Sequence, residues 1–194
     1  MISKWDLLAK LIIDNKYKVI VDIGISKGVT ERGIRDILII RKYNLTSFYG
    51  IDPYKDPYYA MSDSELQSLC NWSPFKFIHK TSDDALEDIP DNVDLVFVDG
   101  SHTPEQRIID LINYSKKIRN GGMLVSHEYG LFITTDLGDY SLVTKFVDEN
   151  IGINNFSTIQ DKRLENLKPC FLFWTYIYRN NSGEIEYSKE PRNI

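Results

Sequence analysis

All three histidines of the chain, His79, His102 and His127, fall at or just after the end of a predicted strand. Random placement would rarely produce this pattern, so we interpret these strand ends as one polar rim. An imidazole with an ordinary pKa near ~6.5 can accept a proton at neutral pH, which suits His102 to act as a general base. Two of these strand ends also carry the carboxylates Asp99 and Glu128, and paired carboxylates suit a hard cation such as Mg²⁺.

The same residues have plainer interpretations. Asp99 could only cap the helix that follows it, His102 could lie in a surface loop, and His127 could hydrogen-bond within the core. For a single histidine, such a structural role is the more common one. The chemical hypothesis therefore depends on the polar residues being gathered at one edge of a sheet.

A turn with two glycines follows the first predicted strand, in the segment Asp22-Ile-Gly24-Ile-Ser-Lys-Gly28. Glycines let the backbone turn tightly and approach a ligand closely. Ser26 stands where the dinucleotide pattern GxGxxG has its second glycine, so a ligand without phosphates fits this turn better than a pyrophosphate. The alternative is a plain strand–helix turn.

Asp52 ends the second predicted strand, roughly 28 residues after Gly24. An acidic residue at this place can accept two hydrogen bonds from a ribose diol. The alternative is a turn aspartate before Pro53, which is common. The glycine turn upstream favours the ribose interpretation.

Alternating strands and helices must position these residues. Strands are predicted at 18–24, 47–52, 75–80, 93–99, 123–127, 153–159 and 171–179. Helices are predicted at 3–16, around 34–41, at 62–69, at 83–88, from 103 onward and around 142–147. This alternation favours an open α/β sheet, in which ligands bind outside the carboxyl ends of the strands.

The helix that begins after Thr103 has the sequence pattern of a capping box. Thr103 stands at the N-cap, Pro104 in the first turn and Gln106 three residues after the cap. The spacing predicts that the helix ends at the glycine pair 121–122 and buries four apolar residues, Ile108, Leu111, Ile112 and Ile118.

The chain has 194 residues, a mass of 22.5 kDa and a net charge of −5. Its ordinary composition excludes a disordered or collagen-like chain, and the acidic balance disfavours a nucleic-acid partner. The two cysteines form no CxxC zinc pattern. Because we find neither a secretory segment nor a membrane span, we expect a cytoplasmic location and no membrane partner.

Four segments resemble, in chain order, the class I S-adenosylmethionine-dependent methyltransferases: Val19–Gly28, Tyr49–Asp52, Asp94–His102 and Gly121–Tyr129. The similarity is strongest to the branch that contains macrolide-sugar O-methyltransferases and cephalosporin-hydroxylase-like proteins. The motifs DGSH and GGMLVSHEY carry it, and it covers roughly residues 17–150.

The resemblance implies a Rossmann-like three-layer α/β fold. Its seven-stranded, mostly parallel sheet would have the order 3-2-1-4-5-7-6, with the last strand antiparallel. We expect one methyltransferase-like domain over residues 1–194. Its parts would be an N-terminal helix at 1–16, a cofactor-binding core at 17–150, C-terminal strands at 151–187 and a tail at 188–194.

The resemblance also implies which residues bind S-adenosylmethionine. They are Asp22, Gly24, Ser26 and Gly28 at the methionine part, Asp52 at the ribose, Ser82 and Asp83 at the adenine, and Asp99 beside the sulfonium.

The catalytic residues implied by the resemblance are His102, as general base, and Asp99. A magnesium ion would be held by Asp99, His127 and Glu128. The family usually has an aspartate where Glu128 stands, so the longer side chain moves this carboxylate by about one methylene.

The implied reaction is methyl transfer to a hydroxyl of a small molecule, and a sugar is one candidate. Aromatic residues in the stretches 53–74 and 129–140 would either cover this acceptor or only pack the loops.

Three alternatives stay open: a protein that binds S-adenosylmethionine without catalysis, a partner subunit and, less favoured, a nicotinamide-dependent oxidoreductase. A homo-oligomer also stays open.

Overall fold

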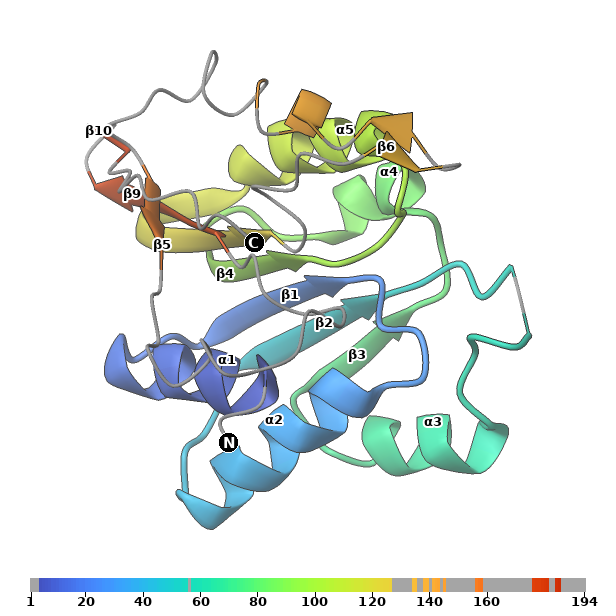
Figure 1. Cartoon of the computed structure of the whole chain (residues 1–194). Helices are drawn as coiled ribbons and strands as arrows, with labels where there is room; N and C mark the ends of the chain where they lie inside the picture. Colours follow the sequence, from blue (N-terminus) through green and yellow to red (C-terminus); the bar gives the residue numbers. More distant parts are fainter. Residues whose placement is uncertain are drawn as a thin grey trace, which may run out of the picture.

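The computed structural model describes residues 4–55, 57–126, 134–135, 138–139, 141–143, 145, 156–158, 176–181 and 184–185. Its helices are α1 (Lys4–Asp14), α2 (Val29–Ile40), α3 (Asp63–Cys70), α4 (Ser82–Ala85) and α5 (Pro104–Ser115), with a 3₁₀ turn η1 (Leu86–Asp88). Figure 1 shows them packed around a central twisted sheet. None of the described helices is long and apolar enough to cross a membrane.

The sheet contains strands from the whole length of the chain. They are β1 (Val19–Ile23), β2 (Ser47–Ile51), β3 (Phe75–Ile78), β4 (Val93–Val98), β5 (Ile118–Ser126), β8 (Phe156–Thr158), β9 (Tyr176–Asn181) and β10 (Glu184–Ile185). A separate two-stranded sheet pairs β6 (Thr134–Thr135) with β7 (Gly138–Asp139).

The strand order confirms the predicted topology. It runs β10-β9-β5-β4-β1-β2-β3, and β8 also pairs with β9. Neighbours among β1 to β5 are parallel, whereas β9 is antiparallel to β5, β8 and β10. With β8 and β9 as the sixth and seventh predicted strands, this is the order 3-2-1-4-5-7-6 of a Rossmann-like fold.

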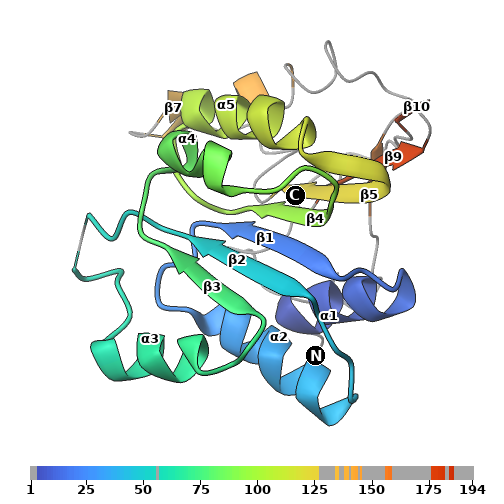
Figure 2. The ribbon, with the colours of Figure 1, turned by 180° about the vertical axis from the view of Figure 1, so that it is seen from behind.

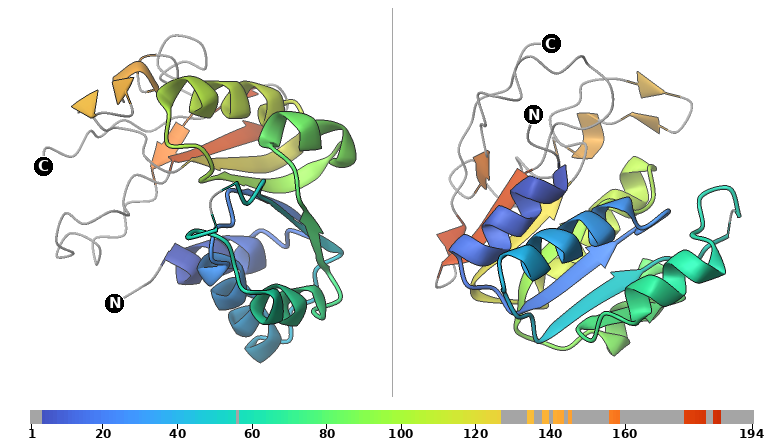
Figure 3. Two further views of the ribbon diagram at one scale, coloured as in Figure 1. Left: turned by 90° about the vertical axis from the view of Figure 1, so that its right-hand side faces the viewer. Right: turned by 90° about the horizontal axis from the view of Figure 1, so that it is seen from below.

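Helices cover both faces of the sheet, which explains the continuous apolar runs in the central strands. Helices α1, α2 and α3 lie on one face, and α4 and α5 lie on the other (Figures 2 and 3). Along β4, Leu95 and Phe97 pack in the cluster with α1 and α2, whereas Val96 and Val98 pack in the cluster with α5. All residues of β4 are buried, as in parallel sheets generally.

The segment after β4 differs from the sequence prediction. Helix α5 ends at Ser115 and β5 begins at Ile118, so Ile118 is buried in a strand. Gly121, at φ +76°, lies where the β4–β5 register is irregular, which lets the strand continue through the glycine pair. Ile112 is exposed because it lies off the buried face of α5, which contains Arg107, Asp110, Leu111 and Tyr114.

The capping box predicted at the start of α5 is wrong. The Thr103 side chain makes no capping hydrogen bond to the helix, and its Oγ1 lies 3.1 Å from Oγ of Ser101. The Gln106 side chain extends to α4 instead of folding back on the N-cap. Pro104 does occupy the first helical position, as predicted.

Candidate active site

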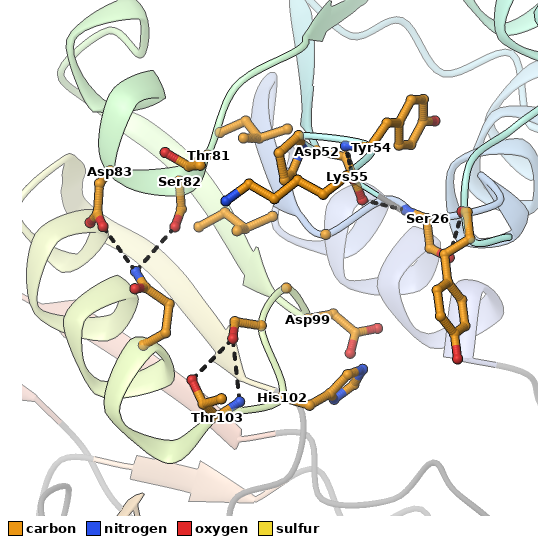
Figure 4. Close-up of a pocket in the computed structure, with 18 residues that line it drawn as sticks. Ser26, Asp52, Tyr54, Lys55, Thr81, Ser82, Asp83, Asp99, His102 and Thr103 are labelled. Atoms are coloured by element: carbon orange, nitrogen blue, oxygen red, sulfur yellow. Dashed lines mark hydrogen bonds between the residues drawn. The ribbon is translucent and has the colours of Figure 1, made fainter. Parts of the chain in front are cut away.

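A pocket of about 680 Å³ opens at the carboxyl ends of β1, β2, β3 and β4. This volume lies within the range of small-molecule and cofactor sites. Four groups of residues line it, and each follows one strand: Gly24 and Ser26; Asp52 to Lys55; Thr81 to Asp83; and Asp99 to Thr103. Figure 4 shows their side chains converging on one space.

Gly24 forms the floor of the pocket where the ends of β1 and β4 meet. Its N–H donates to the carbonyl oxygen of Ile51 at 2.8 Å, and the N–H of Asp99 donates to that of Ile23 at 2.9 Å. A Cβ on Gly24 would lie 2.3 Å from Cα of Gly100, and its φ of +88° favours glycine. The absence of a side chain at position 24 therefore lets the backbones at the ends of β1 and β4 lie against each other.

Asp52 fixes the turn after β1. Its Oδ2 accepts a hydrogen bond from the Ser26 N–H and its Oδ1 accepts one from the Tyr54 N–H, both at 2.8 Å. Ser26 has a left-handed backbone with φ +46°, and its Oγ donates to the Tyr59 carbonyl oxygen at 3.1 Å. Because a carboxylate offers about four lone-pair sites, Asp52 keeps capacity to accept from a ligand.

Tyr54, whose N–H donates to Asp52, packs its ring against two aromatic side chains. Its ring lies 5.0 Å from that of Phe77 and 5.9 Å from that of His79. Burial of the hydroxyl, and next the negative charge of Asp52, raise the pKa of Tyr54 far above its ordinary value of 10.0. This phenol therefore stays protonated at physiological pH.

Helices α4 and α5 meet at the far end of the pocket. Nε2 of Gln106 lies 3.2 Å from Oδ2 of Asp83, 3.1 Å from Oδ1 of Asp110 and 3.4 Å from Oγ of Ser82. The Tyr114 hydroxyl donates to the Ser82 carbonyl oxygen at 2.7 Å. Side chains of α5 therefore hold the first turn of α4.

The loop after β4 presents Asp99 and His102. Asp99 is half-buried, His102 is exposed, and both line the pocket. In Figure 4 their side chains lie on one side of the pocket, away from Ser82 and Asp83. The buried Arg107 donates through Nη1 to the Val98 carbonyl oxygen at 2.6 Å, which fixes the end of β4 to α5 just before this loop.

The structure brings most of the predicted site residues together. Seven of them line the pocket: Gly24, Ser26, Asp52, Ser82, Asp83, Asp99 and His102. Asp22 and Gly28 do not: Asp22 is buried within β1, and Gly28 is the N-cap of α2 and contacts Met61.

Of the three predicted metal ligands, only Asp99 lies among the described residues. Asp99 lines the pocket, whereas His127 and Glu128 lie outside the described residues. Among the residues that are described, no group of three His, Cys, Asp or Glu side chains is arranged to hold a metal ion. Of the three predicted rim histidines, His79 does not line the pocket, and its Nε2 lies 2.9 Å from the Pro53 carbonyl oxygen.

Sequence reasoning missed two residues that shape this site, Gln106 and Arg107. Both lie on α5, where the apolar spacing drew attention to its isoleucines and leucine instead. A buried arginine inside an amphipathic helix carries no signal of its own in the sequence. The glutamine had a signal, three residues after an N-cap threonine, but that signal predicted the wrong partner.

A family model described as a methyltransferase domain matches residues 21–129, which is more than half of the chain. The chain belongs to this methyltransferase family. The matched segment of the methyltransferase runs from β1 through β5 and includes every residue that lines the pocket. A comparison with curated proteins finds no match.

Solved methyltransferase structures share the fold. The O-methyltransferase TomG from Streptomyces achromogenes, solved with S-adenosylmethionine, superposes with a TM-score of 0.66 at 16% identity over 92% of this chain and 80% of its own. The methyltransferase PaMTH1 from Podospora anserina, solved with S-adenosylhomocysteine, gives 0.63 at 16% identity over 92% and 78%.

An rRNA methylase from Streptococcus thermophilus gives a TM-score of 0.64 at 11% identity, over 93% of this chain and 99% of its own. These identities are too low to transfer a substrate from any of the three proteins. The three superpositions show that the chain has the fold of class I S-adenosylmethionine-dependent methyltransferases, as the sequence motifs predicted.

Proposed function

We propose that this methyltransferase transfers a methyl group from S-adenosylmethionine to a hydroxyl group of a small molecule, with His102 as the general base. The observation that carries the proposal is one pocket lined by Asp52, Asp83, Asp99 and His102. It combines carboxylates suited to a nucleoside with an imidazole suited to proton transfer.

The residues present fit the cofactor. Gly24, which lines the pocket, presents only backbone to it. Asp52 keeps acceptor capacity that would serve the ribose hydroxyls, and Ser82 and Asp83, which line the same pocket, would flank the adenine. Ser26 would border the methionine part, whereas Asp22 and Gly28 do not line the pocket.

S-adenosylmethionine supplies an electrophilic methyl group when it is bound. The chain contributes mainly by holding the acceptor hydroxyl in line with that group, since proximity and alignment account for much of such catalysis. His102, exposed on the loop after β4, would take the proton from the hydroxyl. Asp99, His127 and Glu128 would hold Mg²⁺, and the positive charge of a bound metal ion would lower the pKa of the acceptor hydroxyl.

Two exposed tyrosines support a small, ring-containing acceptor. Tyr58 is 71% exposed and Tyr59 is 56% exposed, and their rings make an edge contact at 5.0 Å. Tyr59 lines the pocket, and Nζ of Lys27 lies 4.4 Å from the centroid of the Tyr58 ring. Aromatic faces beside a pocket suit either a sugar, whose C–H groups can pack on them, or a flat ring.

Cofactor binding is the first test of this proposal. Titration calorimetry with S-adenosylmethionine should detect binding to the wild-type protein, and Asp52→Asn should weaken it by about tenfold, because a charged hydrogen-bond acceptor is lost. Asp36→Asn, on the exposed side of α2, is the matched control and should bind like the wild type. The absence of binding at millimolar cofactor would overturn the proposal.

Catalysis is the second test. Wild-type protein and variants are incubated with methyl-labelled cofactor and a panel of sugars, phenols and other small alcohols. His102→Ala should lower kcat by about 100-fold while leaving the dissociation constant of the cofactor within twofold, because the imidazole acts on the acceptor. His79→Gln is the histidine control, since His79 does not line the pocket. Unchanged turnover in His102→Ala would contradict the assignment of the base.

A further inference from the structure

The amide of Gln106 connects two acidic side chains at the nucleoside end of the pocket. Its Nε2 lies 3.2 Å from Oδ2 of Asp83 on α4 and 3.1 Å from Oδ1 of Asp110 on its own helix. Both partners only accept when ionised, so the nitrogen end of the amide must face them. A primary amide has two N–H groups, and one is available for each carboxylate.

Asp110 anchors this amide from the buried side. It is 1% exposed and lies one helical turn after Gln106. Burial raises the pKa of Asp110 above its ordinary value of 3.8, while hydrogen bonds from Ser82 and Gln106 and the charge of Arg107 oppose that rise. Turning the Gln106 amide away would remove one of these bonds from a buried carboxyl, which is costly.

Asp83, in contrast, is exposed and lies on a helix of a single turn. An exposed aspartate samples several rotamers unless a partner fixes it. Gln106 fixes it through Oδ2, and within the described part of the chain no other contact engages Oδ1. Asp83 and Gln106 both line the pocket, so the held carboxylate can present Oδ1 to a bound ligand.

The backbone of α4 is anchored by a different side chain. The Tyr114 hydroxyl donates to the Ser82 carbonyl oxygen at 2.7 Å, so the first turn of α4 stays attached to α5 without Gln106. The contacts of Gln106 with the carboxylate of Asp83 and with Oγ of Ser82 therefore act on side chains of α4 and not on its backbone. Mutation of Tyr114 therefore tests the anchoring of the α4 backbone, and mutation of Gln106 tests the orientation of the Asp83 side chain.

We propose that Gln106 is a positioning residue for nucleobase recognition: it orients the Asp83 carboxylate to accept a hydrogen bond from the exocyclic amino group of adenine. The proposal rests on the function proposed above, because it assumes that an adenine-containing cofactor occupies the pocket. If so, Gln106 determines a preference for a 6-amino purine over a 6-oxo purine. The carbonyl oxygen of a 6-oxo purine cannot donate a hydrogen bond and would face the acceptor oxygen of the carboxylate.

The experiment measures two affinities on each protein by calorimetry, one for S-adenosylhomocysteine and one for S-inosylhomocysteine. The ratio of the two is insensitive to partial unfolding, because both ligands titrate the same preparation. The wild-type protein should prefer the adenosine compound by about tenfold or more, and Gln106→Leu should bring the ratio close to one.

Two further variants serve as controls. Glu105→Leu places the same residue on the exposed neighbouring position of α5 and should keep the wild-type ratio. Tyr114→Phe loosens the α4 backbone without touching the Asp83 side chain, so it should also keep the ratio even where both affinities fall.

Each outcome is decisive. A wild-type preference that disappears in Gln106→Leu and survives in Tyr114→Phe supports the proposal. A preference that Gln106→Leu retains, one that both variants lose equally, or a wild-type protein that does not discriminate would each overturn it. A wild-type protein that binds neither compound would overturn the proposed function itself, which is a different result.

Discussion

The backbone at Gly24 is the most constrained single position of the site. Its φ is +88°, and the nearest atoms to an added Cβ belong to the backbone of Gly100 and Asp99, at 2.3 and 2.5 Å. Backbone cannot move aside as a flexible side chain can. The ends of β1 and β4 can approach each other here only because the position has no side chain.

We expect Gly24→Ala to lower the free energy of unfolding by about 2 kcal/mol or more, since a strained left-handed residue and a clash with backbone add together. Urea denaturation measures this. Gly100→Ala is the graded control, because its φ is not in the left-handed region and its Cβ would find its nearest neighbour, Cγ2 of Ile23, at 3.1 Å. Equal losses in the two variants would contradict the close approach of the strands.

At this scale the sequence predicts residues whose chemistry is local. Gly24 and Asp52 were identifiable because a turn glycine and an acid at a strand end have recognisable spacing, and both line the pocket. Gln106 was assigned a local partner, Thr103, yet it contacts Asp83, 23 positions away on another helix. The spacing of residues within one segment says nothing about such a contact.

At the scale of elements, α5 combines packing with support of the site. Its buried face contains Arg107, Asp110, Leu111 and Tyr114, three of which are polar or charged. Arg107 holds the end of β4, and Tyr114 holds the start of α4. The helix therefore connects the loop of Asp99 with the turn of Asp83.

The raised pKa of Asp110 predicts how stability depends on pH. Burial makes the folded protein hold this proton more tightly than the unfolded chain does. Between the ordinary pKa of 3.8 and the higher folded value, the contribution of Asp110 to stability falls as the pH rises. In the Asp110→Asn variant, the amide side chain cannot ionise, and its oxygen can still accept the hydrogen bond from Nε2 of Gln106.

We therefore expect Asp110→Asn to gain stability relative to the wild type as the pH increases from about 4 to 7. Urea unfolding of both proteins at several pH values measures the difference. Asp91→Asn, at an exposed position, should show no such increase. A difference between Asp110→Asn and the wild type that stays constant with pH would show that Asp110 does not contribute in this way.

The periodicity of the sequence predicts the existence of these elements better than their boundaries and faces. It placed β4 and a helix after it, but it extended that helix to the glycine pair and overlooked its polar buried face. Apolar spacing cannot identify a buried arginine whose partner, the Val98 carbonyl, only the fold supplies. The order of the strands came from the family motifs, since alternation alone fits several orders.

At the scale of the whole molecule, charge discriminates between acceptors. The chain carries a net charge of −5, although an rRNA methylase is among the proteins that share its fold. Nucleic-acid binding draws most of its affinity from cationic contacts with phosphates. An acidic protein with a compact pocket is better suited to a small molecule.

We expect an RNA hairpin to bind only weakly, with a dissociation constant above about 100 μM at 0.15 M salt. Fluorescence anisotropy with a labelled hairpin measures it, and a basic RNA-binding protein is the positive control. Micromolar affinity that falls steeply with added salt would instead indicate an RNA acceptor.

The meeting of β1 and β4 also has a kinetic consequence. The Val19 N–H donates to Asp94 across 75 positions of sequence, and the pocket floor at Gly24 lies at the other end of this strand pair. Pairings between distant segments are the slow events of folding. The ligand cavity therefore forms only once that closure is complete, and a bound nucleoside would slow unfolding without speeding folding. Ligand would thus lengthen the lifetime of the folded chain.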